Sequence, residues 1–345
     1  MPKIEQSNFD AEGTVQSVTL TNDRGTSVQL LSYGAHLRSW TLRDKNAKLI
    51  DIVLGYDSLQ GYHQDQFYLG CVVGRVCGRV RRGQFQLDGK SYSLPINNGP
   101  NHLHGGLVGF SRKLWQVAQV DEALCSVRMG CRSENGDQGY PGTVHCAVDF
   151  QLTNENELKI NFTASTDAPT PIMLTSHGYF NLSGEGAADL SEHIFKINAA
   201  NYLPIDGDDL ATGEIRSVDG TEFDFRCGKK MTDCKTPNLD ACYSISLEND
   251  HKMRHVASVE NRDSGLQFDV YTDQTAVMFY TSRFLDVKEG ANGGKGGKAY
   301  KKGSAFCFET QGHVDAVNHS HFPSIILRPG ESYKHACVYK VTPLE

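Results

Sequence analysis

Residues 144–164 read VHCAVDFQLTNENELKINFTA, and their apolar side chains recur at every second position on both sides of an Asn-Glu-Asn turn. Successive side chains of a strand point to opposite faces of a sheet, so this period of two indicates two half-buried strands joined as a hairpin. Two more hairpins are predicted, at residues 18–30 and at residues 84–94. The second has an Asp88-Gly89 turn, which supplies the positive φ angles of a type I′ turn.

The rest of the chain shows the same pattern of short strands and turns. Short runs of β-forming residues alternate with glycine-rich turns, and no apolar stripe of helical period extends beyond about two turns. This pattern predicts an all-β protein built as a sandwich or barrel of antiparallel sheets, with few short helices. No proline- or serine-rich linker divides the 345 residues, so we expect a single domain over residues 1–345.

Composition excludes several classes of protein. The net charge of −7 argues against a nucleic-acid partner, because such binders normally carry a basic excess. No apolar run approaches the roughly 18 residues of a membrane span, and the N-terminus lacks the apolar core of a signal peptide. The ten cysteines are irregularly spaced without a Cys-x-x-Cys pair, which favours reduced thiols in a cytoplasmic protein.

Two motifs suggest a bound metal or phosphate but do not complete either site. His102 and His104 share one face of a strand, yet no further ligand lies nearby in the sequence, so we expect no metal and no cofactor. The following pair, Gly105 and Gly106, suits a binding loop that a ligand approaches closely. The glycine- and lysine-rich segment 288–298 lacks the P-loop pattern, and we interpret it as a flexible surface loop or a lid.

Glu309 ends a short strand-like run, Ser304 to Phe308. In a strand, Ala305, Cys307 and Glu309 share one face, while the two phenylalanines between them point to the other. A carboxylate at the end of a row of small side chains can face a cavity. A glutamate at a strand end more commonly faces water, so this residue alone decides nothing.

His177 lies between the apolar run 172–174 and the aromatic pair Tyr179-Phe180. A histidine in such surroundings is more often hydrogen-bonded in a core than catalytic. A proton donor and a proton acceptor that meet across a cleft can, however, open and close a sugar ring, and His177 and Glu309 are the pair we select. Three other polar residues would by default be solvated: Arg79, Asp240 and Gln274.

An ordered set of short motifs resembles the aldose 1-epimerase (mutarotase) family. The motifs span nearly the whole chain and follow the order of the family: Ser32–Ala35, Asp51–Ser58, Val73–Arg75, Leu103–Gly106, Gly139–Gly142, Thr175–Leu182, Phe223–Arg226, Phe308–Gln311 and Leu327–Gly330. The resemblance implies a large antiparallel β-sandwich with a sugar cleft. It also implies an isomerase that interconverts the α and β anomers of free aldohexoses such as galactose and glucose, without a cofactor.

The resemblance also implies roles for particular residues. Glu309 matches the general base of the family and His177 its general acid. Four residues match its hydroxyl-binding groups: Arg79, His104, Asp240 and Gln274. Tyr179 is expected to pack under the sugar ring. The partner is then a small monosaccharide, with neither nucleic acid nor membrane involved, and the protein is expected to be a monomer or a weak homodimer.

The sequence departs from the family pattern at several positions. Asparagine is usual where Gly78, Ser176 and Arg283 stand, and Ala241-Cys242 replaces a His-Asn pair. Gly78 and Ala241 cannot make the hydrogen bonds of those side chains, so sugar affinity or preference is expected to differ. A sugar-binding protein without turnover is one alternative that these changes leave open.

Two enzymatic alternatives remain at the level of sequence. A hexose-6-phosphate 1-epimerase would need a cluster of basic side chains for the phosphate, and Arg75, Arg81 and Arg283 are available besides Arg79. A glycoside hydrolase would use Glu309 with Asp240 as its two carboxylates, but His177 would then have no evident task.

Overall fold

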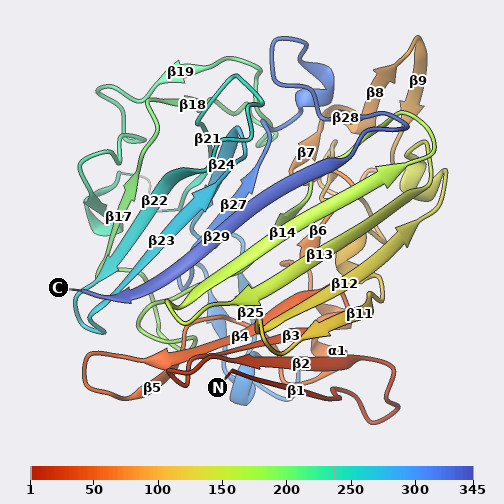
Figure 1. The fold of residues 1–345 in the computed structure, drawn as a ribbon. Coiled ribbons are helices and arrows are strands. Elements are labelled where there is room, and N and C mark those ends of the chain that lie inside the picture. The colour runs from red at the N-terminus through yellow and green to blue at the C-terminus, as the bar shows by residue number, and fades with distance from the viewer. Residues whose placement is uncertain (1, 236–237, 345) are drawn as a thin grey trace.

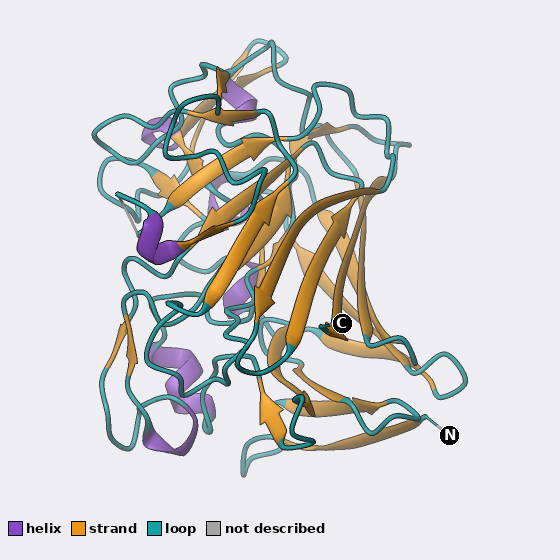
Figure 2. Cartoon of the chain, turned by 90° about the vertical axis from the view of Figure 1, so that its left-hand side faces the viewer, coloured by secondary structure: helices purple, strands orange, loops and turns teal. Residues whose placement is uncertain are grey.

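The computed structural model describes residues 2–235 and 238–344. A nine-stranded antiparallel sheet dominates the molecule (Figure 1), and helices are few and short (Figure 2). In spatial order this sheet contains β11 (Gln116–Asp121), β12 (Ser126–Ser133), β13 (Val144–Leu152), β14 (Glu157–Thr166), β29 (Tyr333–Pro343), β23 (Leu266–Thr272), β22 (Arg254–Asn261), β17 (His193–Ile197) and β20 (Lys229–Lys230).

Two five-stranded sheets complete the larger layers. One contains β1 (Lys3–Asn8), β2 (Gln16–Thr21), β3 (Ser27–Leu31), β4 (His36–Arg43) and β5 (Leu49–Asp51). The other contains, in spatial order, β19 (Arg216–Ser217), β18 (Asn201–Leu203), β21 (Asp240–Ser244), β24 (Ala276–Tyr280) and β27 (Cys307–Gln311). One continuous apolar core joins all three sheets, which confirms the predicted antiparallel β-sandwich.

Smaller elements connect these sheets. The two-stranded pairs are β6 (Val72–Val73) with β16 (Thr175–Ser176), β7 (Arg79–Val80) with β10 (His102–Leu103), β8 (Gln84–Leu87) with β9 (Lys90–Ser93), β15 (Thr170–Pro171) with β28 (Ile326–Leu327), and β25 (Asp286–Val287) with β26 (Tyr300–Lys301). The α-helix is α1 (Leu59–Gln64), and 3₁₀ turns lie at Arg81–Gly83, Phe110–Arg112, Asp137–Gly139, Met231–Asp233, Lys295–Gly297 and Ala316–Asn318. Within the described residues, no helix is both long and apolar enough to cross a membrane.

The three predicted hairpins are confirmed. β13 and β14 pair antiparallel with Val148 opposite Phe162, β2 pairs with β3, and β8 pairs with β9. The turn between β8 and β9 places Asp88 at φ 49° and Gly89 at φ 75°, as the Asp-Gly pair requires. Local patterning was therefore sufficient to predict these elements.

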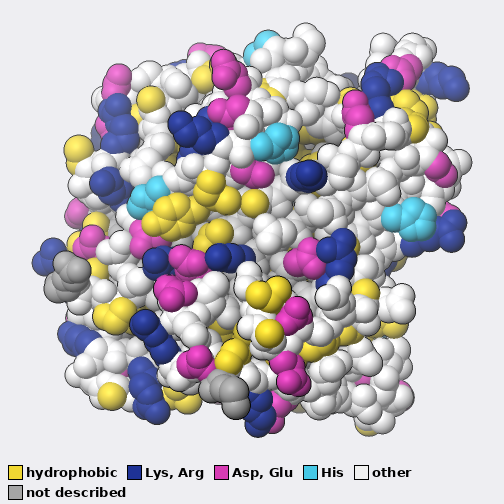
Figure 3. Space-filling model, in the orientation of Figure 1, with side chains coloured by type: hydrophobic (Ala, Val, Ile, Leu, Met, Phe, Trp, Pro, Cys, Tyr) yellow, Lys and Arg dark blue, Asp and Glu magenta, His cyan; other side chains and the backbone are white. Residues whose placement is uncertain are grey.

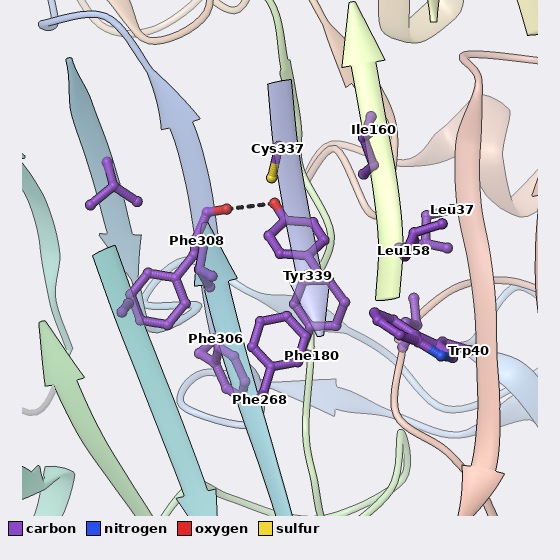
Figure 4. Packing of buried hydrophobic residues seen from close by; sticks show 14 of the residues in the cluster. Leu37, Trp40, Leu158, Ile160, Phe180, Phe268, Phe306, Phe308, Cys337 and Tyr339 are labelled. Carbon is purple, nitrogen blue, oxygen red and sulfur yellow. Dashed lines mark hydrogen bonds between the residues drawn. The ribbon is translucent and has the colours of Figure 1, made fainter. Parts of the chain in front are cut away.

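The aromatic core lies directly beneath β27. Phe306 and Phe308 face the nine-stranded sheet, where Phe306 packs against Phe268 and the hydroxyl of Tyr339 donates a 2.7 Å hydrogen bond to the carbonyl of Phe308 (Figure 4). Ala305 and Cys307 belong to a second apolar cluster on the opposite face. The predicted alternation is confirmed, and its consequence is that Glu309 points away from the core between the sheets.

The segment 288–298 lies largely at the surface, as predicted, but it is anchored to the rest of the molecule through Lys295. Lys295 is buried, and its ammonium group lies 2.7 Å from the carboxylate of Asp51 and 2.8 Å from the carbonyl of Val53. Gly294 forms an isolated bridge with Tyr56. In the described structure no residue of this segment lines the cavity discussed below, so nothing supports the lid interpretation.

The outer face of the molecule carries charges of both signs. On the side seen in Figure 3, lysine and arginine side chains are intermixed with aspartate and glutamate. This mixture agrees with the moderate net charge of −7.

Candidate active site

A cavity of about 190 Å³ opens beside β27 and collects most of the residues selected from the sequence. Its wall receives side chains from strands β7, β21, β24 and β27 and from the segments that follow β10 and β16. Five of the six predicted site residues line it: Arg79, His104, His177, Asp240 and Glu309. These residues are distant in the sequence, and the sheets bring them together.

The two candidate proton-transfer groups are direct neighbours. Nε2 of His177 lies 3.5 Å from Oε1 of Glu309, and both side chains are buried. Glu309 is fixed by β27, where it stands opposite Met278 of β24, and the backbone N–H of His177 donates to the carbonyl of Cys71. The pair therefore lies side by side on one wall, instead of on opposite sides of the cleft as the sequence interpretation pictured.

Burial shifts the pKa values of this pair in opposite directions. Burial raises the pKa of Glu309 to about 8, and the charge of Asp240 adds to the rise while Arg79 opposes it. Burial lowers the pKa of His177 to about 4, against a backbone hydrogen bond that favours its charged form. Between these two values the pair holds a single proton, and the two shifts place that proton on Glu309.

Aromatic rings hold the imidazole of His177 in place. The ring of Tyr179 stacks on it with centroids 5.0 Å apart, and the ring of Tyr280 meets it edge-on at 6.3 Å. The hydroxyl of Tyr179 donates a 2.7 Å hydrogen bond to the carbonyl of Phe67, which fixes that ring in turn. Tyr179 thus orients the candidate acid, and its ring lies against His177.

A buried ion pair faces the same cavity. Nη1 of Arg79 lies 3.4 Å from Oδ2 of Asp240, and Nε of Arg79 donates a 2.9 Å hydrogen bond to Oδ1 of Asn98. Burial raises the pKa of Asp240, although the guanidinium group of Arg79 opposes this shift. A guanidinium and a carboxylate beside each other offer donors and acceptors to the hydroxyl groups of a sugar.

His104 presents a fixed donor. Its Nδ1 accepts a 3.2 Å hydrogen bond from the backbone N–H of Gly78, so the proton of the neutral ring is on Nε2. Burial, together with the nearby His177 and Arg79, keeps the pKa of His104 well below its usual range, and the ring stays neutral. His104 is therefore arranged to donate to an oxygen atom.

Three side chains of the site have the composition of a metal centre. His104, His177 and Glu309 place one potential ligand atom each within 4.8 Å of one another. The protonated Nε2 of His104 has no lone pair for a metal, however. Nδ1 of His177 has no hydrogen-bond partner among the described residues, whereas a ligating histidine normally has such support. The arrangement fits proton transfer to sugar oxygens better than metal binding.

Gln274 is not brought to this site. It lies in the turn between β23 and β24, where its Nε2 donates to Oδ1 of Asp273, and it lines a different cavity with Thr275 and Tyr333. Met278, within β24, lines the cavity of Glu309 and stands opposite that residue in the sheet. The predicted hydroxyl-binding role of Gln274 therefore has no geometric support.

Sequence analysis missed several residues of the cavity wall. They are Gln66, Phe67, Tyr68, Asn98, Leu103, Met278, Tyr280, Phe284 and Gln311. Gln311 was detectable, because it follows Glu309 by two positions on β27 and therefore shares its face. The others depend on packing between elements distant in the sequence.

The remaining arginines singled out from the sequence are engaged elsewhere. Arg75 is buried, and its guanidinium group donates to the hydroxyl and carbonyl of Ser133 and to the carbonyls of Glu134 and Pro141. Two further arginines pair with carboxylates, Arg81 with Asp206 at 3.1 Å and Arg283 with Asp209 at 2.9 Å. None of the three lines the cavity in the part of the chain that the structure describes.

Comparisons with known proteins identify the family of this chain. The family model described as aldose 1-epimerase matches residues 16–340. Galactose mutarotase of Bos taurus is 41% identical over 332 residues, which covers 95% of this chain and 94% of that protein. Aldose 1-epimerase of Escherichia coli (strain K12) is 32% identical over 333 residues, which covers 94% of each. The solved GalM/aldose epimerase homologue from C. elegans superposes with a TM-score of 0.87 at 31% identity, over 100% of both chains.

Proposed function

The chain belongs to the aldose 1-epimerase family and is an isomerase of aldoses, and we propose that it interconverts the α and β anomers of free galactose and glucose by acid–base catalysis. The observation that carries the proposal is the 3.5 Å contact between Nε2 of His177 and Oε1 of Glu309 inside a buried cavity. The ring oxygen and the anomeric hydroxyl of a pyranose are bonded to the same carbon. Two groups this close can therefore serve both oxygens at once.

The proposed reaction moves one proton in each direction. The Glu309 carboxylate removes the proton from the O1 hydroxyl, while protonated His177 delivers its proton to the ring oxygen, and the C1–O5 bond breaks. The resulting aldehyde rotates about the C1–C2 bond. The ring closes on the other face as Glu309 returns its proton to O1 and His177 recovers the proton from O5. This cycle starts with the proton of the pair on His177, so Glu309 first passes its proton to His177 across their 3.5 Å contact.

The other polar side chains of the cavity are proposed to hold the sugar. Arg79 with Asp240 offers donors and acceptors, and Nε2 of His104 offers a donor. A substrate that lacks one of the matching hydroxyl groups would leave a buried polar group unpaired, which is costly. We leave Gln274 out of this set because it faces another cavity.

The arginine contacts weigh against a hexose 6-phosphate as substrate. A phosphate site needs guanidinium or ammonium groups that are free to pair with it. Arg79 is paired with Asp240, and Arg81 and Arg283 are paired with other aspartates. The glycoside-hydrolase alternative is weakened by the same Arg79 contact, because it gives Asp240 a binding role while Glu309 pairs with His177.

We extend the proposal to the whole protein. One functional domain over residues 1–345 is supported by a family match from residue 16 to residue 340 and by site residues that span most of the chain. A cytoplasmic location is proposed from the composition, and the ten cysteines are free thiols. We propose a monomer or a weak homodimer as the state in solution.

Polarimetry of freshly dissolved α-D-galactose tests the proposal. The protein should accelerate the change of optical rotation above the buffer rate, more strongly for glucose than for glucose 6-phosphate. Glu309→Gln should lower kcat by at least about 100-fold while galactose still binds, because the base is lost and the cavity is kept. Glu260→Gln, on β22 of the nine-stranded sheet, is the matched control and should retain full activity. No acceleration by the wild-type protein would favour a binding protein instead.

A further inference from the structure

Gln311 is a fully buried amide in the wall of the catalytic cavity. Its position on β27, two residues after Glu309, directs its side chain to the same face of the strand. Its Oε1 accepts a hydrogen bond from Sγ of Cys77 at 3.3 Å. Its Nε2 has no hydrogen-bond partner within residues 2–235 and 238–344. A buried amide donor without a partner is costly, and such a group at a cavity wall calls for an explanation.

Gly78 leaves open space next to this unpaired amide. Gly78 also lines the cavity, and a β-carbon placed on it would lie 3.7 Å from Nε2 of Gln311 and 3.4 Å from the side chain of Val314. These are ordinary contact distances, so a β-carbon would fit there without collision. The space above Gly78 is therefore bordered on one side by a free donor and lies beside the ion-paired Arg79.

We propose that Nε2 of Gln311 and the space above Gly78 form a subsite that binds one hydroxyl group of the sugar. The proposal rests on the proposed mutarotase function. A hydroxyl oxygen accepts from the free N–H, and its own proton stays available to another acceptor. The group is a hydroxyl other than the anomeric one, because His177 and Glu309 act on O1 and the ring oxygen. Gln311 then determines specificity and takes no part in proton transfer.

Gln311→Met is the first test, because methionine keeps the length of the side chain and removes the amide. KM and kcat are measured for galactose and for its 2-deoxy, 3-deoxy, 4-deoxy and 6-deoxy derivatives. In the wild-type protein, one deoxy sugar should show a KM about tenfold above that of galactose through the loss of this bond. In Gln311→Met, galactose itself should bind about tenfold more weakly, and that same deoxy sugar should no longer be distinguished from it. The value of kcat should change little.

A purely structural role for Gln311 gives a different pattern. Loss of packing would raise KM by the same factor for every sugar and leave the ratios between sugars unchanged. Identical ratios in the wild-type protein and in Gln311→Met would therefore overturn the proposal. Selective loss of discrimination at one hydroxyl group would support it.

Gly78→Asn is an independent second variant, which keeps the proposal testable if Gln311→Met does not fold. Gly78 has φ 72°, a left-handed conformation that asparagine tolerates better than other side chains. In the wild-type background the new side chain should occupy the subsite and reduce discrimination at the same hydroxyl. In Gln311→Met its amide should restore part of the lost affinity for galactose. A Gly78→Asn protein with unchanged ratios for all five sugars would contradict the subsite.

Calorimetric titration of galactose separates this inference from the proposed function. If the wild-type protein binds galactose but does not accelerate mutarotation, the proposed function fails, and the ratios of Kd between sugars still test the subsite. If mutarotation is rapid and Gln311→Met discriminates as the wild-type protein does, only the subsite fails.

Discussion

The activity of this protein is expected to be confined between two pH limits. The proposed mechanism requires one proton on the pair formed by His177 and Glu309, which lie 3.5 Å apart. The pKa of Glu309 is raised to about 8 and that of His177 is lowered to about 4, chiefly by burial in both cases. The plot of log kcat/KM against pH should therefore be a broad bell with limbs near these two values, which belong to the pair as a unit.

The alkaline limb gives the sharper measurement. Above its limit the pair loses its proton, and kcat/KM should fall about tenfold per pH unit, so that roughly 1% of the plateau remains two units higher. Free galactose mutarotates faster in base, so the buffer rate is subtracted at each pH. Exchange between the anomeric proton signals in NMR then gives the enzymatic rate where polarimetry becomes too slow.

Asp240→Asn tests the cause of the raised pKa of Glu309. The negative charge of Asp240 raises the pKa of Glu309, and Arg79 lowers it. Removing the carboxylate should therefore move the alkaline limb to lower pH, because Arg79 then acts on Glu309 without its ion-pair partner. A limb that stays in place or moves to higher pH would refute the electrostatic reasoning. A flat profile in the wild-type protein would refute the shared proton itself.

Three further variants test the energetics of the fold. The raised pKa of Glu309 means that the folded state binds this proton more tightly than the unfolded chain does, so the resulting stabilisation is present below pH 4.5 and is lost as pH rises through about 8. The stability of Glu309→Gln relative to the wild type should therefore increase with rising pH, by up to about 5 kcal/mol, and a pH-independent difference in thermal unfolding would contradict this. Arg75→Lys should lower the free energy of unfolding in urea by about 2–4 kcal/mol with little change in the KM for galactose, because an ammonium group cannot reproduce the two guanidinium contacts to Ser133. Unchanged stability would show that these hydrogen bonds are dispensable. Lys295→Met should lower the free energy of unfolding by about 3 kcal/mol, because it leaves the carboxylate of Asp51 without its ammonium partner. The control Lys288→Met, at an exposed position, should change the free energy of unfolding by less than about 0.5 kcal/mol, and equal effects would indicate that Lys295 is as dispensable as a surface residue.

Local patterns in the sequence predicted much of the fold. The period of two in residues 144–164 predicted β13 and β14, because the alternation of a strand depends only on which face is buried. The same rule predicted that Phe306 and Phe308 would be buried while Glu309 points the other way. Such inferences succeed because each residue and its immediate neighbours hold the necessary information.

Inferences that depended on distant contacts were less secure. Gln274 and Met278 are four residues apart, but of the two only Met278 lines the candidate active-site cavity. Gln274 precedes β24, whereas Met278 stands opposite Glu309 in the sheet. The segment 288–298 was predicted to be a surface loop, but Lys295 within it is buried and pairs with Asp51, which lies 244 positions earlier in the chain. Nothing within either segment indicates such partners.

The place of β29 in the large sheet affects the order in which the sheet can form. Among the described strands β29 comes last in sequence, yet it lies between β14 and β23 and joins them through pairs such as Ile160 with Cys337 and Val270 with Tyr339. The pairing of β29 with β14 joins residues that are far apart in the sequence, and such contacts are slow to form because the entropy of loop closure must be paid first. Until β29 enters the sheet, β14 and β23 each present an unpaired edge, and unpaired edges are the sites at which partly folded chains associate.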